Sequence, residues 1–207
     1  MGWYENCIFI FEIKPKLKIM KQVFFMAVIA LISLNSNSLI AQENPAEGPN
    51  FSKIDASPMD LVLYKNQDNE VVARVIYSRP QKRDREIFGK LIPYGEVWRT
   101  GANESTELTL YKDMKVADVT VNAGTYTIYT IPKENEWVVI LNNDVHTWGA
   151  YEYTDKKDQV RITVPVRKSP TSIESFSMAF VPSANGANLL MGWDDRYIEV
   201  PFKTIVK

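Results

Sequence analysis

Cysteine and histidine are nearly absent from this sequence, because its 207 residues include one of each. A single cysteine excludes an intrachain disulfide framework and a cysteine-rich zinc site. A single histidine excludes a multi-histidine metal centre within one chain. An excess of one charge is also missing, since 24 basic residues stand against 25 acidic ones. We therefore expect no metal site, no cofactor and no nucleic-acid partner.

Long hydrophobic runs are missing as well. The uncharged apolar run from Val23 to Leu34 is shorter than the roughly 20 residues that a membrane-spanning helix needs. Lys18 and Lys21 precede this run, and the small residue Ala41 follows it after a polar stretch. This order of basic flank, apolar centre and small residue is typical of a secretory signal peptide.

The signal peptide predicts how the chain is processed. We expect cleavage after Ala41, so that residues 1–41 are removed and no stable membrane span is left. Met20 followed by Lys21 would itself open a signal peptide of ordinary length, which makes residues 1–19 an upstream extension. The predicted location is outside the cytoplasm, either periplasmic or extracellular.

The rest of the chain reads as a linker at 42–58 and a single domain at 59–207. The linker is polar and contains three prolines. The domain shows period-two alternation with many β-branched and aromatic residues, and turn residues separate the alternating segments. The predicted strands are 61–64, 71–77, 106–111, 116–121, 125–131, 137–142, 159–166, 176–181, 189–192 and 197–204.

These strands predict an all-β fold, an antiparallel β-sandwich, with the jelly roll as one form to consider. The segment at 176–181 illustrates the pattern. Phe176, Met178 and Phe180 fall on one face, and small or polar residues fall on the other. One apolar face and one polar face are what a layer of an antiparallel sandwich requires.

Residues 78–105 break the alternation and are rich in arginine, glycine and proline, so we look for a site there. The string at 98–104 reads WRTGANE. Trp98 offers a stacking face, and Arg99 a planar set of donors for a carboxylate or phosphate. Asn103 and Glu104 can accept hydrogen bonds from ligand hydroxyls. The alternative is structural: Arg99 pairs with Glu104 to fix the loop, and Trp98 lies in the core.

Two further segments contribute candidates. Arg79 precedes a proline at the end of a predicted strand, and this makes it the best placed of several basic residues at 79–85. Trp148 lies near His146 in a predicted turn, where it could close a pocket. A lone exposed histidine is more often idle than catalytic, and no known catalytic motif is present. An enzyme assignment therefore stays open, with the balance against it.

The chain resembles the bacterial domain-of-unknown-function family 2911. The resemblance covers about residues 55–205, and the WRTGANE string is its most specific part. This resemblance implies an exported protein of the bacterial envelope, which agrees with the signal peptide. It implies no activity, so no catalytic role comes from it. The matching segments are residues 77–80, 87–104, 122–126, 130–132, 137 and 148–151.

Three hypotheses for function follow. The first is a non-catalytic module that binds a small polar ligand, such as a sugar or an anionic metabolite. The second is a structural or interaction module without a ligand. The third is a hydrolase with Glu104 as general base and Arg99 stabilising negative charge. The oligomeric state stays open. The ligand-binding candidates are Arg79, Trp98, Arg99, Asn103, Glu104 and Trp148.

Overall fold

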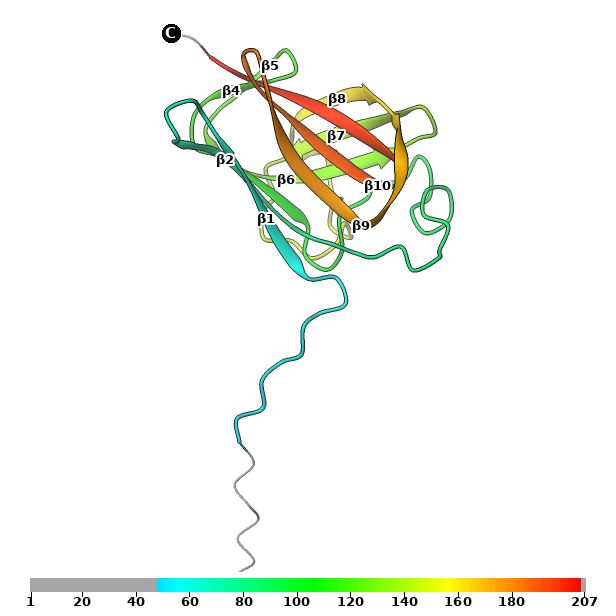
Figure 1. Cartoon of the computed structure of the whole chain (residues 1–207). Helices are drawn as coiled ribbons and strands as arrows, with labels where there is room; N and C mark the ends of the chain where they lie inside the picture. Colours follow the sequence, from blue (N-terminus) through cyan, green and yellow to red (C-terminus); the bar gives the residue numbers. More distant parts are fainter. Residues whose placement is uncertain (1–47, 206–207) are drawn as a thin grey trace, which may run out of the picture. The chain divides into compact units, whose positions relative to one another are not determined.

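The computed structural model describes residues 48–205, and in that part of the chain ten β-strands form two antiparallel sheets (Figure 1). The prediction of an antiparallel β-sandwich is confirmed. The expected upstream extension, signal peptide and first part of the linker lie outside the described residues. The strands are β1 (Met59–Lys65), β2 (Val71–Ser78), β3 (Thr106–Leu110), β4 (Met114–Val116), β5 (Val119–Val121), β6 (Gly124–Pro132), β7 (Glu136–Asn142), β8 (Asp158–Pro165), β9 (Arg167–Ser183) and β10 (Gly186–Thr204).

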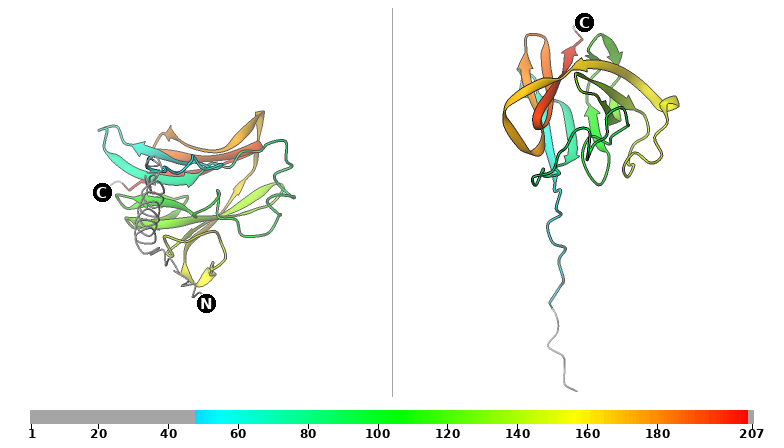
Figure 2. Two further views of the ribbon diagram at one scale, coloured as in Figure 1. Left: turned by 90° about the horizontal axis from the view of Figure 1, so that it is seen from below. Right: turned by 90° about the vertical axis from the view of Figure 1, so that its right-hand side faces the viewer.

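The two sheets have the orders β1-β2-β3-β6-β7-β8 and β5-β4-β10-β9. Most neighbours in each sheet follow one another along the chain, except that β4 and β5 leave the larger sheet to join the smaller one. This is a meander that changes layer, rather than the two Greek keys of a jelly roll. In the right-hand view of Figure 2, β9 and β10 lie opposite the green strands of the larger sheet.

Alternation along the strands produces the core between the sheets. In β9, Phe176 and Met178 are buried and Phe180 packs against the core, whereas Ala179 faces solvent. In β8, Val160 and Val164 are likewise buried between exposed neighbours. The face predicted for residues 176–181 is therefore confirmed, and β8 alternates in the same way. Burial of such side chains is the main force that holds the layers together.

Two strand predictions differ from the structure for local reasons. Residues 116–121 form parts of two strands, because Ala117 has a φ of 52° and reverses the chain. Residues 189–192 and 197–204 belong to one strand, β10, whose pairing with β9 shifts register around Asp194. Asp194 has a φ of 54°, so the backbone bulges there without ending the strand.

An aromatic cluster fills the end of the core beside the irregular segment 79–105. Trp98 stacks on Trp193 at 6.1 Å between ring centroids and meets Phe176 edge-on at 5.0 Å. Phe88 packs on Trp137 with 5.0 Å between centroids. The segment 79–105 therefore contributes core side chains as well as surface, and this gives its polar residues a rigid base.

Candidate functional site

The first part of the irregular segment, residues 79–85, runs beside β9 as a short extra edge. The backbone N–H of Phe176 donates to the Pro80 carbonyl at 2.9 Å, and the Lys82 N–H donates to the Glu174 carbonyl at 2.7 Å. Arg79 donates to the Asp60 carboxylate at 2.9 Å, the Phe176 carbonyl at 3.2 Å and the Ser177 hydroxyl at 2.8 Å. Arg79 thus ties β1 to β9 with most of its donors.

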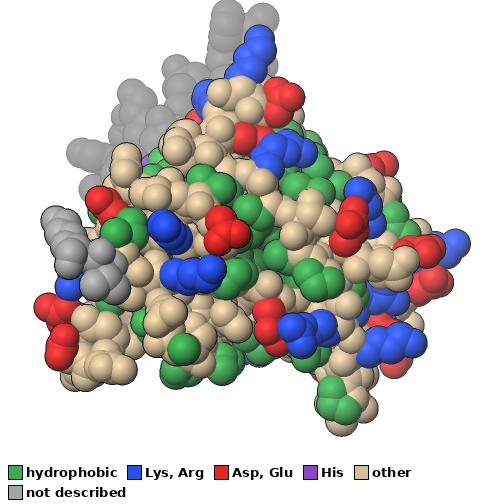
Figure 3. All heavy atoms as spheres, turned by 90° about the horizontal axis from the view of Figure 1, so that it is seen from above, with side chains coloured by type: hydrophobic (Ala, Val, Ile, Leu, Met, Phe, Trp, Pro, Cys, Tyr) green, Lys and Arg blue, Asp and Glu red, His purple; other side chains and the backbone are tan. Residues whose placement is uncertain are grey.

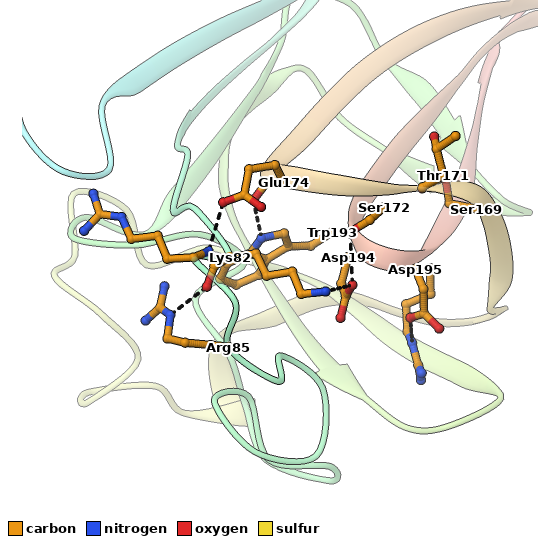
Figure 4. A network of polar contacts seen from close by, with 11 residues as sticks. Lys82, Arg85, Ser169, Thr171, Ser172, Glu174, Trp193, Asp194 and Asp195 are labelled. Atoms are coloured by element: carbon orange, nitrogen blue, oxygen red, sulfur yellow. Dashed lines mark hydrogen bonds and ion pairs between the residues drawn. The ribbon is translucent and has the colours of Figure 1, made fainter.

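A network of polar contacts fixes the next residues against the bulge in β10 (Figure 4). Lys82 pairs with Asp194 at 2.5 Å, and this hydrogen bond raises the pKa of Lys82. The Trp193 indole N–H donates to the Glu174 carbonyl at 3.1 Å. Arg85 donates to the Lys82 carbonyl at 2.9 Å, so its guanidinium is oriented by a neutral backbone acceptor.

Asp194 and Asp195 have separate basic partners. Asp194 faces Lys82, whereas Asp195 pairs with Arg196 at 3.0 Å. The Arg196 guanidinium also donates to the Tyr94 hydroxyl at 2.8 Å, and it lies 5.4 Å from the centre of the Phe88 ring. The bulge in β10 is therefore bound to the irregular segment by charged contacts on both sides.

The last part of the irregular segment, residues 97–105, is held in a strained conformation. Trp98 and Thr130 exchange backbone hydrogen bonds of 2.7 and 2.9 Å, which join the loop to β6. Thr100 is fully buried with a φ of 57°, a region that costs about 1–3 kcal/mol for a residue other than glycine. Its hydroxyl contacts that of Thr130 at 3.1 Å, and its carbonyl accepts from Thr106 at 2.7 Å. These two contacts, one to the hydroxyl and one to the carbonyl, offset the strain and hold Thr100 in place.

A cavity of about 420 Å³ opens beside this strained loop, and we call it the arginine cavity. Its apolar wall includes Leu91, Ile92 and Val97, and the edges of two core indoles reach it. Trp98 is only 6% exposed and its indole N–H already donates to the Gly101 carbonyl, so little of this ring is free to stack on a ligand. The polar lining consists of Ser57, Arg85, Glu96, Arg99 and Asn103.

Arg99 is the unusual member of this lining. Its Nε atom is buried and has no hydrogen-bond partner within residues 48–205. Its guanidinium also makes no ion pair among the described residues, so the pair with Glu104 considered from the sequence is not formed. A buried donor without an acceptor costs about 1–3 kcal/mol, and the cost is larger for a charged group.

Asn103 lies at the rim of the arginine cavity and connects it to the segment before β1. Its amide donates to the Asp55 carboxylate at 3.0 Å. The backbone N–H of Ser57 and this amide hold the pKa of Asp55 below its usual value. Asn103 has a φ of 56°, which an asparagine tolerates better than most residues.

The sequence of this domain matches the model of a known family. The model of the family described as "Protein of unknown function (DUF2911)" covers residues 57–202. The chain belongs to this family. No curated protein and no solved structure matches it significantly. The DUF2911 domain thus comprises both sheets and the irregular segment that surrounds the arginine cavity.

Glu104 faces a different cavity of the DUF2911 domain, of about 290 Å³, which we call the histidine cavity. There the His146 Nδ1 lies 3.0 Å from a carboxylate oxygen of Glu107. The His146 side chain is 81% exposed, so the pair sits at the rim rather than in the interior. Glu107 was not predicted as a site residue, because its place in β3 gave no local signal.

Trp148 completes the list of predicted residues. It is 61% exposed and lines neither of these two cavities, although its backbone forms a bridge with that of Glu104. The structure therefore brings together Trp98, Arg99 and Asn103, and places Arg79, Glu104 and Trp148 elsewhere. Arg85, Glu96 and Trp193 join the group although they were not predicted.

The DUF2911 domain offers little support for other kinds of site. Between residues 48 and 205, no three His, Cys, Asp or Glu side chains gather closely enough to hold a metal ion. The same residues contain no helix with the length and apolar character that a membrane crossing requires. On the face shown in Figure 3, acidic and basic side chains are interspersed, and neither charge forms a continuous field.

Proposed function

We propose that this protein is an exported binding module whose DUF2911 domain holds a small polar ligand with an anionic group in the arginine cavity. The observation that carries the proposal is the buried, unpartnered Nε of Arg99. A carboxylate or phosphate on the ligand would supply the missing acceptor, and a guanidinium binds such groups through two parallel hydrogen bonds. The volume of about 420 Å³ suits a small molecule.

The site is also preorganised, which supports binding. Backbone pairing of Trp98 with β6 and the buried hydroxyls around Thr100 fix the loop that presents Arg99. Arg85 is held by backbone carbonyls and adds a second positive charge to the same lining. A ligand that enters such a site does not have to order the loop, so less binding free energy is lost.

The test is a thermal-shift and calorimetry screen of the DUF2911 domain with citrate, gluconate and glucuronate as anionic probes, and glucose as a neutral probe. A probe at 100 times its Kd stabilises the native state by about 2.7 kcal/mol, which raises Tm by about 5–10 °C in a domain of this size. We expect anionic probes to do this in the wild type and not in Arg99→Gln.

Arg74→Gln is the matched control. The Arg74 Nε is also buried without a partner, but Arg74 lies on β2 and does not line the arginine cavity. We expect this variant to bind as the wild type does. If no anionic probe raises the Tm of the wild type by more than it raises the Tm of Arg99→Gln, the proposal fails and a structural module without a ligand is favoured.

The hydrolase hypothesis gains less from the geometry. It needs Glu104 and Arg99 beside the same substrate, and these residues line different cavities. Glu107 and His146 line the same cavity as Glu104, but among residues 48–205 no side-chain hydrogen bond joins Glu104 to either of them.

A further inference from the structure

The arginine cavity contains a negative charge as well as positive ones. Glu96 lines it, is exposed, and makes no hydrogen bond or ion pair among residues 48–205. Arg99, on the same cavity, also forms no ion pair with a carboxylate in the described part of the chain. The two opposite charges therefore share one cavity and do not neutralise each other.

This combination is informative because a ligand that enters the cavity meets charges of both signs. Elsewhere in the domain some opposite charges are satisfied within the protein, as in Arg79 with Asp60 and Lys82 with Asp194. A purely anionic ligand would satisfy Arg99 and would be repelled by Glu96. A neutral sugar would leave both charges without a charged partner. A ligand with one charge of each sign would satisfy both.

We infer that the ligand is a small zwitterion, with a carboxylate at Arg99 and a primary ammonium at Glu96. This inference rests on the proposed function, because it assigns the anionic group to the same arginine. The ammonium can donate up to three hydrogen bonds, and a free carboxylate such as Glu96 accepts them. Leu91, Ile92 and Val97 provide apolar contact for the hydrocarbon between the two charges.

Free α-amino acids and short peptides both have this chemistry. They differ in the distance between the charges, so both classes enter the test. The probes are L-alanine and L-alanyl-L-alanine as zwitterions, N-acetyl-L-alanyl-L-alanine as a carboxylate without an ammonium, and L-alanyl-L-alaninamide as an ammonium without a carboxylate. Binding is measured by isothermal titration calorimetry at pH 7.

We expect at least one zwitterion to bind the wild type tenfold or more tightly than the acetylated peptide and the amide. In Glu96→Gln, the zwitterion should weaken to the affinity of the acetylated peptide. In Arg99→Gln, binding of zwitterions and of the acetylated peptide should be lost. Glu152→Gln, an exposed glutamate that does not line the cavity, is the matched control and should leave all affinities unchanged.

The outcomes separate this inference from the proposed function. If the acetylated peptide or another anion binds the wild type as tightly as the zwitterions, the zwitterion inference is overturned and the anion site stands. If the amide binds as tightly as the zwitterions, or if Glu96→Gln keeps the full preference for them, the inference is overturned as well. If no carboxylate probe of either screen binds, both proposals fail. Tm of each variant without ligand confirms that it is folded.

Discussion

The two ends of the irregular segment treat their arginines differently. At residues 79–85, Arg79 and Arg85 donate to carbonyls, a hydroxyl and a carboxylate of the domain itself. At residues 97–105, Arg99 has a buried Nε with no acceptor. The first end links the two sheets, and we call residues 79–85 the clasp. The second end presents an arginine that lacks a partner in the described part of the chain. The number of acceptors of a guanidinium, taken together with its position on a cavity, therefore distinguishes a structural arginine from a candidate ligand-binding one.

The largest expected effect is that of Arg79→Ala on stability. The substitution removes contacts to Asp60, Phe176 and Ser177, and we expect it to lower the free energy of unfolding by about 2–3 kcal/mol. Arg99→Ala removes a buried donor that has no acceptor among residues 48–205, so we expect the free energy of unfolding to stay the same or to rise by about 1–3 kcal/mol. Urea unfolding of the two variants measures the difference. Equal losses would show that the comparison between the two ends is wrong.

A smaller effect is expected from Gly101→Ala. A Cβ at this position would lie 3.1 Å from the Ser78 carbonyl oxygen and 3.2 Å from the Thr106 hydroxyl, and the first of these is backbone. We expect a loss of about 1–2 kcal/mol from overpacking. Relief of these close contacts should move the loop that presents Arg99, so ligand affinity should fall together with Tm. Unchanged affinity would mean that the loop does not position Arg99.

Alkaline pH tests the clasp through Lys82. Its hydrogen bond to Asp194 raises its pKa above the ordinary lysine value of 10.5. A raised folded pKa means that the stabilisation is fully present below pH 10.5 and is lost as the pH rises through the folded value. The Tm difference between wild type and Lys82→Met should thus stay constant from about pH 7 to 9 and shrink above 10.5. A difference that shrinks between pH 7 and 9 would contradict this.

The smallest effect is expected from Glu104→Gln. Glu104 adjoins Asn103 in sequence but lines the histidine cavity, so its charge should not enter binding at the arginine cavity. We expect the Kd of an anionic probe to stay within about twofold of the wild-type value, which corresponds to about 0.4 kcal/mol. Calorimetry with the probe that binds best decides this. A tenfold change in Kd would mean that Glu104 contributes to binding at the arginine cavity.

The sequence supports much of the fold and a smaller part of the site. Period-two alternation assigned the inward face of Phe176 and Met178, because successive side chains of a strand point to opposite faces and the apolar set marks the buried one. The continuity of β10 was not predictable, since its bulge at Asp194 carries polar residues that resemble a strand end. Arg99 and Asn103 were found because they are close in sequence. Trp193 lies on β10 in the smaller sheet and lines the arginine cavity, and no local sequence pattern predicts a contact between parts of the chain so far apart.

The contact between Asn103 and Asp55 has a practical consequence for anyone who produces this domain. Asp55 and Ser57 belong to the stretch just ahead of β1, and Ser57 helps to line the arginine cavity. A purification handle fused immediately before that stretch would start within a few residues of the entrance and could compete with soaked or titrated molecules. Expression vectors with the handle after residue 207 leave the entrance as the native chain has it.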